Sequence, residues 1–132
     1  MITVHVAEQL DHVLRTQGRS WQPSPGDRFV IPGRDLDDVF VVAEMTIEVE
    51  ELATGRLIRF NGTTEWALDS IPAAEVLWLP WEHQLRDLLG ERFVSLERVA
   101  AGFAVTLTDG SRFVGDDAEA AYARALLGDE LG

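Results

Sequence analysis

The second half of the chain changes twice between the apolar spacing of a helix and that of a strand, and this order constrains the fold more than any other feature of the sequence. Three segments rich in apolar and β-branched residues, 93–99, 103–108 and 111–114, are predicted to form strands. Asp109-Gly110 separates the last two and is a two-residue hairpin signal. We therefore expect an antiparallel meander of three strands.

A helix is predicted on either side of this meander. The first is expected to end at Gly90, and its apolar face is formed by Trp81, Leu85, Leu88 and Leu89. The second is expected to begin at Asp116, because Asp116 and Glu119 have the spacing of a capping box. Its buried face is predicted to consist of Ala118, Ala121, Tyr122, Ala125 and Leu126. The second half is thus predicted to have the order α-β-β-β-α.

The first half is predicted to contain one helix followed by a small antiparallel sheet. Thr3 is a suitable cap for a helix that ends near Gly18, and its apolar stripe consists of Val6, Leu10, Val13 and Leu14. The expected strands are 28–31, a segment within 39–51, 56–60 and a short segment within 63–68. Turns are expected at 53–55 and 61–62, and a turn-rich connection at 69–76.

Together these elements predict an α+β protein. Its length of 132 residues matches the commonest domain size, and its hydrophobic fraction of 46% is enough for one core. We therefore expect one compact domain over residues 1–132, with one candidate subdivision near 69–76. The sequence does not distinguish one continuous sheet from two small sheets.

The charge of the chain restricts its partners. Acidic residues outnumber basic ones by 23 to 11, all eleven basic residues are arginines, and the net charge is −12. Binding to nucleic acid depends on cations that neutralise phosphates, so we expect no nucleic-acid partner. Anionic membrane surfaces are disfavoured for the same reason. A protein with a basic surface is the partner that this charge favours, and a monomer and a homodimer are both compatible with it.

The sequence also lacks several residues and patterns on which particular kinds of site and location depend. Without cysteine the chain has no disulfides, no thiolate nucleophile and no cysteine-ligated zinc. It has no apolar run of membrane-spanning length and no signal-peptide core at residues 1–20, so we predict a cytoplasmic protein. His5, His12 and His83 lack the spacing of a zinc site. We expect no metal, no cofactor and no catalytic residues.

Three segments carry a resemblance to a known group of proteins. They are WQPSPGDRF at 21–29, LWLPWEHQL at 77–85 and DAEAAY at 117–122. These segments resemble a group of short bacterial and phage proteins of unknown function, in which W-x-P-x-x-G-D-x-F is followed by WLPR-x-x-QL and a C-terminal EEA helix. The resemblance covers most of residues 21–127 and implies no activity. Trp81 stands where the group more usually has arginine.

The segment 59–66 is the first candidate site. Short polar side chains lie beside aromatic residues at a predicted turn, and this arrangement suits a small ligand. The candidate ligand-binding residues are Asn61, Thr64, Glu65 and Trp66, with Trp66 as a stacking wall. The alternative is a hairpin turn with one tryptophan at the edge, and composition favours that alternative.

Trp78 and Trp81 form the second candidate site. Large aromatic residues at a junction between a strand and a helix can anchor a protein partner. The alternative is that both belong to the core, with Trp81 as the first residue of the apolar stripe of its helix. The sequence favours the core.

Two functions follow from these observations. The first is a non-enzymatic protein-binding or accessory module that contacts a basic partner near Trp78 and Trp81. The alternative is a small-molecule-binding protein or a hydrolase, with a pocket near Arg28, Arg59, Glu65 and Asp69. A deep pocket with converging polar groups favours the second function, and a filled core with an exposed aromatic anchor favours the first.

Overall fold

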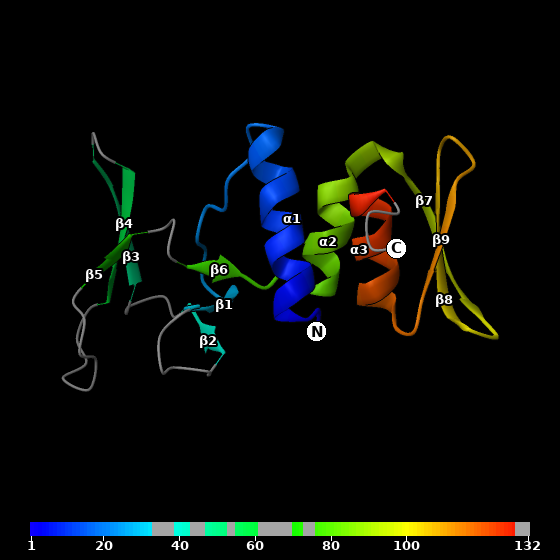
Figure 1. The fold of residues 1–132 in the computed structure, drawn as a ribbon, viewed down its shortest axis with the longest axis horizontal. Coiled ribbons are helices and arrows are strands. Elements are labelled where there is room, and N and C mark those ends of the chain that lie inside the picture. The colour runs from blue at the N-terminus through cyan, green and yellow to red at the C-terminus, as the bar shows by residue number, and fades with distance from the viewer. Residues whose placement is uncertain (33–38, 43–46, 53–54, 61–69, 73–75, 129–132) are drawn as a thin grey trace. The chain divides into compact units, whose positions relative to one another are not determined.

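The structure is a computed structural model that describes residues 1–32, 39–42, 47–52, 55–60, 70–72 and 76–128. It is a mixed α+β protein, as predicted, and it forms two compact units (Figure 1). Unit 1 joins Met1–Ser20 to Pro80–Gly132, and unit 2 is Trp21–Leu79. The expectation of a single domain with a subdivision near 69–76 stays a prediction. In the described part of the chain no helix is long and apolar enough to cross a membrane.

Unit 1 begins with helix α1, Val4–Thr16, in agreement with the prediction. The hydroxyl oxygen of Thr3 accepts a hydrogen bond from the backbone N–H of Val6 at 3.1 Å, which satisfies one of the free donors at the start of the helix. The chain leaves the helix through Gly18, which has a φ of 72°. Ala7, Leu10 and Leu14 are the buried residues of α1. One face of this helix therefore belongs to the core of unit 1.

The rest of unit 1 has the predicted order of a helix, three strands and a helix. These elements are α2 (Glu82–Leu89), β7 (Phe93–Val99), β8 (Gly102–Leu107), β9 (Arg112–Gly115) and α3 (Ala118–Leu127), with a 3₁₀ turn at Gly90–Arg92 after α2. The strands pair antiparallel in the order β7-β8-β9. The meander predicted from the sequence is confirmed.

Two details of unit 1 differ from the prediction. The β8–β9 connection is a three-residue loop, because Leu107 donates its N–H to the carbonyl of Ser111, and Gly110 takes the positive φ of 86° that closes such a loop. The cap of α3 is Asp117 and not Asp116. The Asp117 carboxylate accepts from the backbone N–H of Ala120 at 2.7 Å.

Helix α3 lies at the centre of the packing in unit 1, where it contacts β8, β9, α2 and α1. Five of the six residues from Ala121 to Leu126 are buried, with Arg124 exposed, and Tyr122 is fully enclosed. At Gly115 the backbone of β9 comes so close to α3 that an added Cβ would lie 2.5 Å from the backbone nitrogen of Ala121. The close packing of β9 against α3 therefore requires glycine at position 115.

Unit 2 contains two small antiparallel sheets. One has the order β2-β1-β6, with β1 at Arg28–Val30, β2 at Phe40–Val41 and β6 at Leu77–Trp78. The other has the order β3-β4-β5, with β3 at Ile47–Leu52, β4 at Gly55–Phe60 and β5 at Ser70–Pro72. The predicted hairpin between a strand within 39–51 and the strand at 56–60 is confirmed, but Gly55, which was expected in the turn, begins β4 opposite Leu52.

The prediction of an irregular connection over 69–76 is wrong at residues 70–72, which form β5. Pro72 is compatible with this strand because β5 lies at the edge of its sheet, where a missing N–H donor is tolerated. The predicted turn at 61–62 and the predicted strand within 63–68 lie outside the described residues. In the described part, the chain therefore forms three three-stranded sheets.

Candidate functional site

A surface hollow of about 340 Å³ lies in unit 1, and five side chains line it: Trp81, Glu82, His83, Arg86 and Glu119. Four of them come from the start of α2 or from the residue before it, and Glu119 comes from the first turn of α3. The hollow combines one aromatic ring, one guanidinium, one imidazole and two carboxylates. Its volume is at the small end of the range for ligand-binding clefts.

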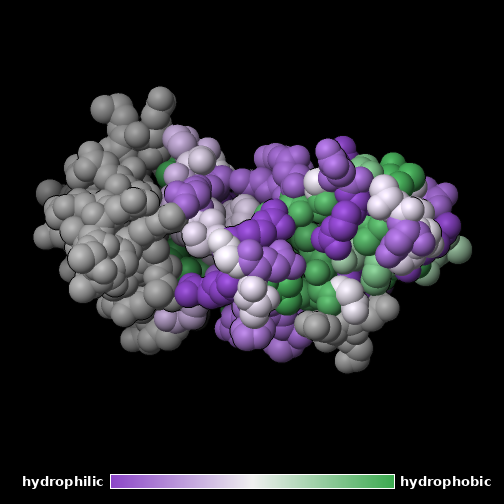
Figure 2. All heavy atoms as spheres, turned by 90° about the horizontal axis from the view of Figure 1, so that it is seen from above, coloured by the Kyte–Doolittle hydropathy of each residue, from purple (hydrophilic) through white to green (hydrophobic). Residues whose placement is uncertain are grey.

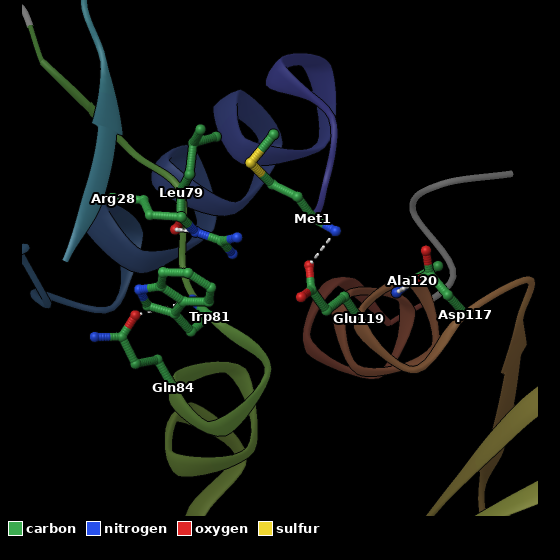
Figure 3. A network of polar contacts seen from close by, with 8 residues as sticks. All are labelled: Met1, Arg28, Leu79, Trp81, Gln84, Asp117, Glu119 and Ala120. Carbon is green, nitrogen blue, oxygen red and sulfur yellow. Dashed lines mark hydrogen bonds and ion pairs between the residues drawn. The ribbon is translucent and has the colours of Figure 1, made fainter. Parts of the chain in front are cut away.

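Trp81 stands immediately before α2, at the N-cap position, with an extended backbone (φ −72°, ψ 164°). Its backbone N–H donates to the side-chain oxygen of Gln84 at 2.9 Å, as Figure 3 shows. This bond is half of a capping box, and the indole cannot supply the other half because it has no acceptor. Trp81 is 37% exposed while Leu85 is fully buried. The expectation that Trp81 begins the buried stripe is therefore wrong, since the stripe begins one turn later.

Glu119 closes one side of the hollow. Its carboxylate forms an ion pair with the amino group of Met1 at 2.7 Å, and its side chain is only 16% exposed (Figure 3). Because the Met1 amine balances the charge of this carboxylate, Glu119 adds little net charge to the hollow.

Arg86 is fixed in place by aromatic residues. Its Nε–H donates to the hydroxyl oxygen of Tyr122 at 2.9 Å, and its guanidinium carbon lies 5.0 Å from the ring centre of Phe93 and 5.7 Å from that of Tyr122. These are cation–π distances. The hydrogen bond with Tyr122 is the main reason that the pKa of Arg86 is raised above its ordinary value. Arg86 is thus a permanent and well-oriented cation.

Glu82 lies one helical turn before Arg86, in the arrangement that usually forms a surface ion pair. Within the described residues no ion pair joins them, because the guanidinium is directed to Tyr122 and Phe93 instead. Neither Glu82 nor Arg86 makes another hydrogen bond or ion pair there. The hollow therefore presents the carboxylate of Glu82 and the Nη groups of Arg86, which have no hydrogen-bond or ion-pair partner among the described residues.

Trp78 lies in β6 of unit 2, within a group of stacked aromatic rings. Its ring is parallel to that of Trp21 within 8°, at a centroid distance of 6.4 Å, and Trp21 also contacts Phe29, which in turn stacks on Phe40. The indole nitrogen of Trp78 is buried and has no hydrogen-bond partner among the described residues. This environment fits the core alternative for Trp78.

The segment 21–27 has a structural role in unit 2. The buried carboxylate of Asp27 accepts from the indole N–H of Trp21 at 2.9 Å and from the backbone N–H of Ser24 at 3.0 Å. Gly26, between them, has a φ of 92°, a conformation that glycine adopts without strain. The bond from Trp21 joins the two ends of the segment, and the two bonds together close it into a loop.

The other predicted site residues are only partly described. Arg28 is buried, and its Nε–H donates to the carbonyl of Leu79 at 3.3 Å, which is a structural contact (Figure 3). The backbone of Arg59 is in β4, opposite Glu48. All other residues of the two predicted ligand sites, Asn61, Thr64, Glu65, Trp66 and Asp69, lie outside the described residues.

A second hollow of about 340 Å³ lies along α1 and is lined by His5, Glu8, Gln9 and His12. The side-chain oxygen of Gln9 is buried there without a hydrogen-bond partner in the described part of the chain. The described residues contain no group of three or more side chains that could hold a metal ion. Helical spacing places His5 and His12 along one face of α1, a pairing that the sequence analysis did not predict.

No protein-family model matches this chain, and no curated protein or solved structure is significantly similar to it.

Proposed function

We propose that this protein is a non-enzymatic binding module, and that the hollow at Trp81 is the centre of its contact surface. The observation that carries this proposal is the exposed ring of Trp81 beside the oriented guanidinium of Arg86. Tryptophan and arginine are the residue types that most often dominate binding energy at protein interfaces. The indole of Trp81 has no acceptor with which to cap α2, and 37% of the residue is exposed at the surface of the hollow.

The charge of the chain supports a basic partner. Unit 2 has 11 acidic residues against 4 arginines, and the segments of unit 1 together have 12 against 7. Both units thus contribute to the net charge of −12, and each attracts a cationic surface at low ionic strength. Electrostatic attraction raises the association rate, and a central aromatic contact slows dissociation.

Figure 2 shows hydrophobic residues that reach the surface among hydrophilic ones, on the face that it draws. In unit 1 the large apolar residues that are clearly exposed, among those described, are Met1, Val4, Trp81, Val94 and Val114. Of these, only Trp81 lines the hollow. Val94, which is 55% exposed on β7, is an exposed apolar control position that does not line the hollow.

The proposal is tested with two fluorescent peptides, one with alternating arginine and glycine and one with alternating glutamate and glycine. We expect the full chain to bind the arginine peptide at low salt, with an affinity that falls as the salt concentration rises. Trp81→Ala should weaken binding about tenfold, which corresponds to the loss of one interface anchor. Val94→Ala should have no effect.

Two results would contradict the proposal. One is equal binding of the two peptides, and the other is equal affinity of the Trp81→Ala and Val94→Ala variants. Affinity capture from cytosol at low salt, with the same two variants, extends the test to natural partners. A partner retained equally by both variants would place the contact surface elsewhere.

A further inference from the structure

The open charges of Glu82 and Arg86 identify a ligand class. A glutamate placed four residues before an arginine on a helix normally forms an ion pair worth about 0.3 to 0.5 kcal/mol. In this protein the bond from Arg86 Nε–H to Tyr122 and the contact with Phe93 replace that pair. The two Nη groups of Arg86 and the carboxylate of Glu82 remain unused among the described residues.

We propose that the hollow binds a free α-amino acid with an apolar or aromatic side chain. The Nη groups of Arg86 receive its carboxylate in a fork-to-fork arrangement, which is the strongest geometry for this pair. The carboxylate of Glu82 receives its ammonium group, and the ring of Trp81 receives its side chain. This inference goes beyond the proposed function, because it assigns a small molecule to the surface that contacts a partner.

The charges in the hollow favour a zwitterion over an ion of either sign. An anion would bind Arg86 but would be repelled by Glu82 and by a chain with a net charge of −12. A small cation confined to the hollow would bind Glu82 but would meet the fixed guanidinium of Arg86, whereas an extended basic surface also meets the other acidic residues of the chain. Glu119 is already paired with the Met1 amine at 2.7 Å. A ligand that carries both charges satisfies both open groups and has no net charge to be repelled.

The volume of the hollow agrees with a ligand of this size. About 340 Å³ is enough for one amino acid and is small for a nucleotide or an oligosaccharide. The guanidinium is oriented before the ligand arrives, because Tyr122 and Phe93 hold it, so binding does not have to order a long side chain.

Three compounds that differ only in their charges test the inference by calorimetry on the full chain. They are L-phenylalanine, phenethylamine, which lacks the carboxylate, and 3-phenylpropionate, which lacks the ammonium group. We expect saturable binding of L-phenylalanine and binding at least about tenfold weaker for the other two, since each loses one charge-assisted contact. L-Leucine and L-tryptophan are included to cover other apolar side chains.

Variants assign the contacts. Glu82→Gln removes the negative group at an exposed position, and it should weaken L-phenylalanine binding about tenfold while 3-phenylpropionate, no longer repelled by a carboxylate, binds as well or better. Arg86→Gln should abolish the difference between L-phenylalanine and phenethylamine. Glu97→Gln, which removes an exposed carboxylate on β7, is the matched control and should bind as the unaltered chain does.

The inference is overturned if none of the three amino acids binds saturably, if phenethylamine or 3-phenylpropionate binds as well as L-phenylalanine, or if Glu82→Gln and Glu97→Gln bind equally. These outcomes are independent of the peptide experiment. Loss of amino-acid binding with intact binding of the arginine peptide would refute this inference alone, and the reverse result would refute only the proposed function.

Discussion

Gly115 provides a quantitative test of the packing in unit 1. In Gly115→Ala the new Cβ would lie 2.5 Å from the backbone nitrogen of Ala121 and 2.8 Å from the backbone carbon and the Cβ of Ala120. Ordinary contacts of a Cβ begin at about 3.4 Å, so α3 must move away from β9 by about 1 Å. Because two of these contacts are with helix backbone, no side-chain rotation relieves them.

The expected loss is about 2 kcal/mol in the free energy of unfolding, which is typical of an overpacked core. For a unit of this size that loss lowers the melting temperature by about 10 °C. Urea denaturation and thermal melts followed by circular dichroism measure both quantities. Val114→Ala, on the exposed side of the same strand, should change the free energy of unfolding by about 0.5 kcal/mol or less. A Gly115→Ala variant as stable as Val114→Ala would refute the close approach of α3 to β9.

Two further predictions concern single polar contacts in unit 1. Asp117→Ala should lower the free energy of unfolding by about 1 kcal/mol in urea melts, because it removes the cap of α3. Asp116→Ala should change the free energy of unfolding much less. Equal losses in the two variants would contradict the assigned cap. The pKa of Asp109 is held below its ordinary value of 3.8, chiefly by the hydroxyl of Ser111. The contact between the ionised Asp109 and Ser111 therefore stabilises the folded chain above pH 3.8, and this stabilisation is lost as the pH falls through the lowered pKa. In a carbon-13 NMR titration Ser111→Ala should raise that pKa, and an unchanged pKa would refute the hydrogen bond from the Ser111 hydroxyl to the Asp109 carboxylate.

Much of unit 1 is predictable from the sequence because its signals are local. The hydroxyl of Thr3 caps α1 through a bond within three residues, and burial alternates along β9 as its apolar spacing predicts. The cap of α3 is displaced by one residue from the prediction because Asp116 and Asp117 are chemically equivalent as caps. Which of the two caps the helix depends on where β9 ends, and that is a tertiary property.

β5 was not predictable by the same means. The segment Ser70–Pro72 has the composition of a turn, and only its pairing with β4 makes it a strand. Local propensity contains no information about a partner strand that is distant in the sequence. The strand is confined to an edge, where proline is tolerated.

The candidate site was predictable only in part. The sequence identified Trp81 but also placed it in the buried stripe of α2, since periodicity cannot distinguish the N-cap from the first turn. The orientation of Arg86 depends on Tyr122, 36 residues away, and therefore on how α2 packs against α3. A glutamate and an arginine four residues apart normally indicate a closed surface pair, so local spacing predicts the opposite of what the structure shows.

The Nε–H resonance of Arg86 in ¹H–¹⁵N spectra tests this arrangement most directly. Because the Nε–H donates to the Tyr122 hydroxyl beside two aromatic rings, we expect slow exchange with solvent and a chemical shift displaced from those of the other arginines. In Tyr122→Phe both effects should diminish, since the acceptor is lost. An Arg86 signal that exchanges as fast as those of the exposed arginines, and that Tyr122→Phe does not change, would show that the guanidinium is not held and that the proposed site does not exist in this form.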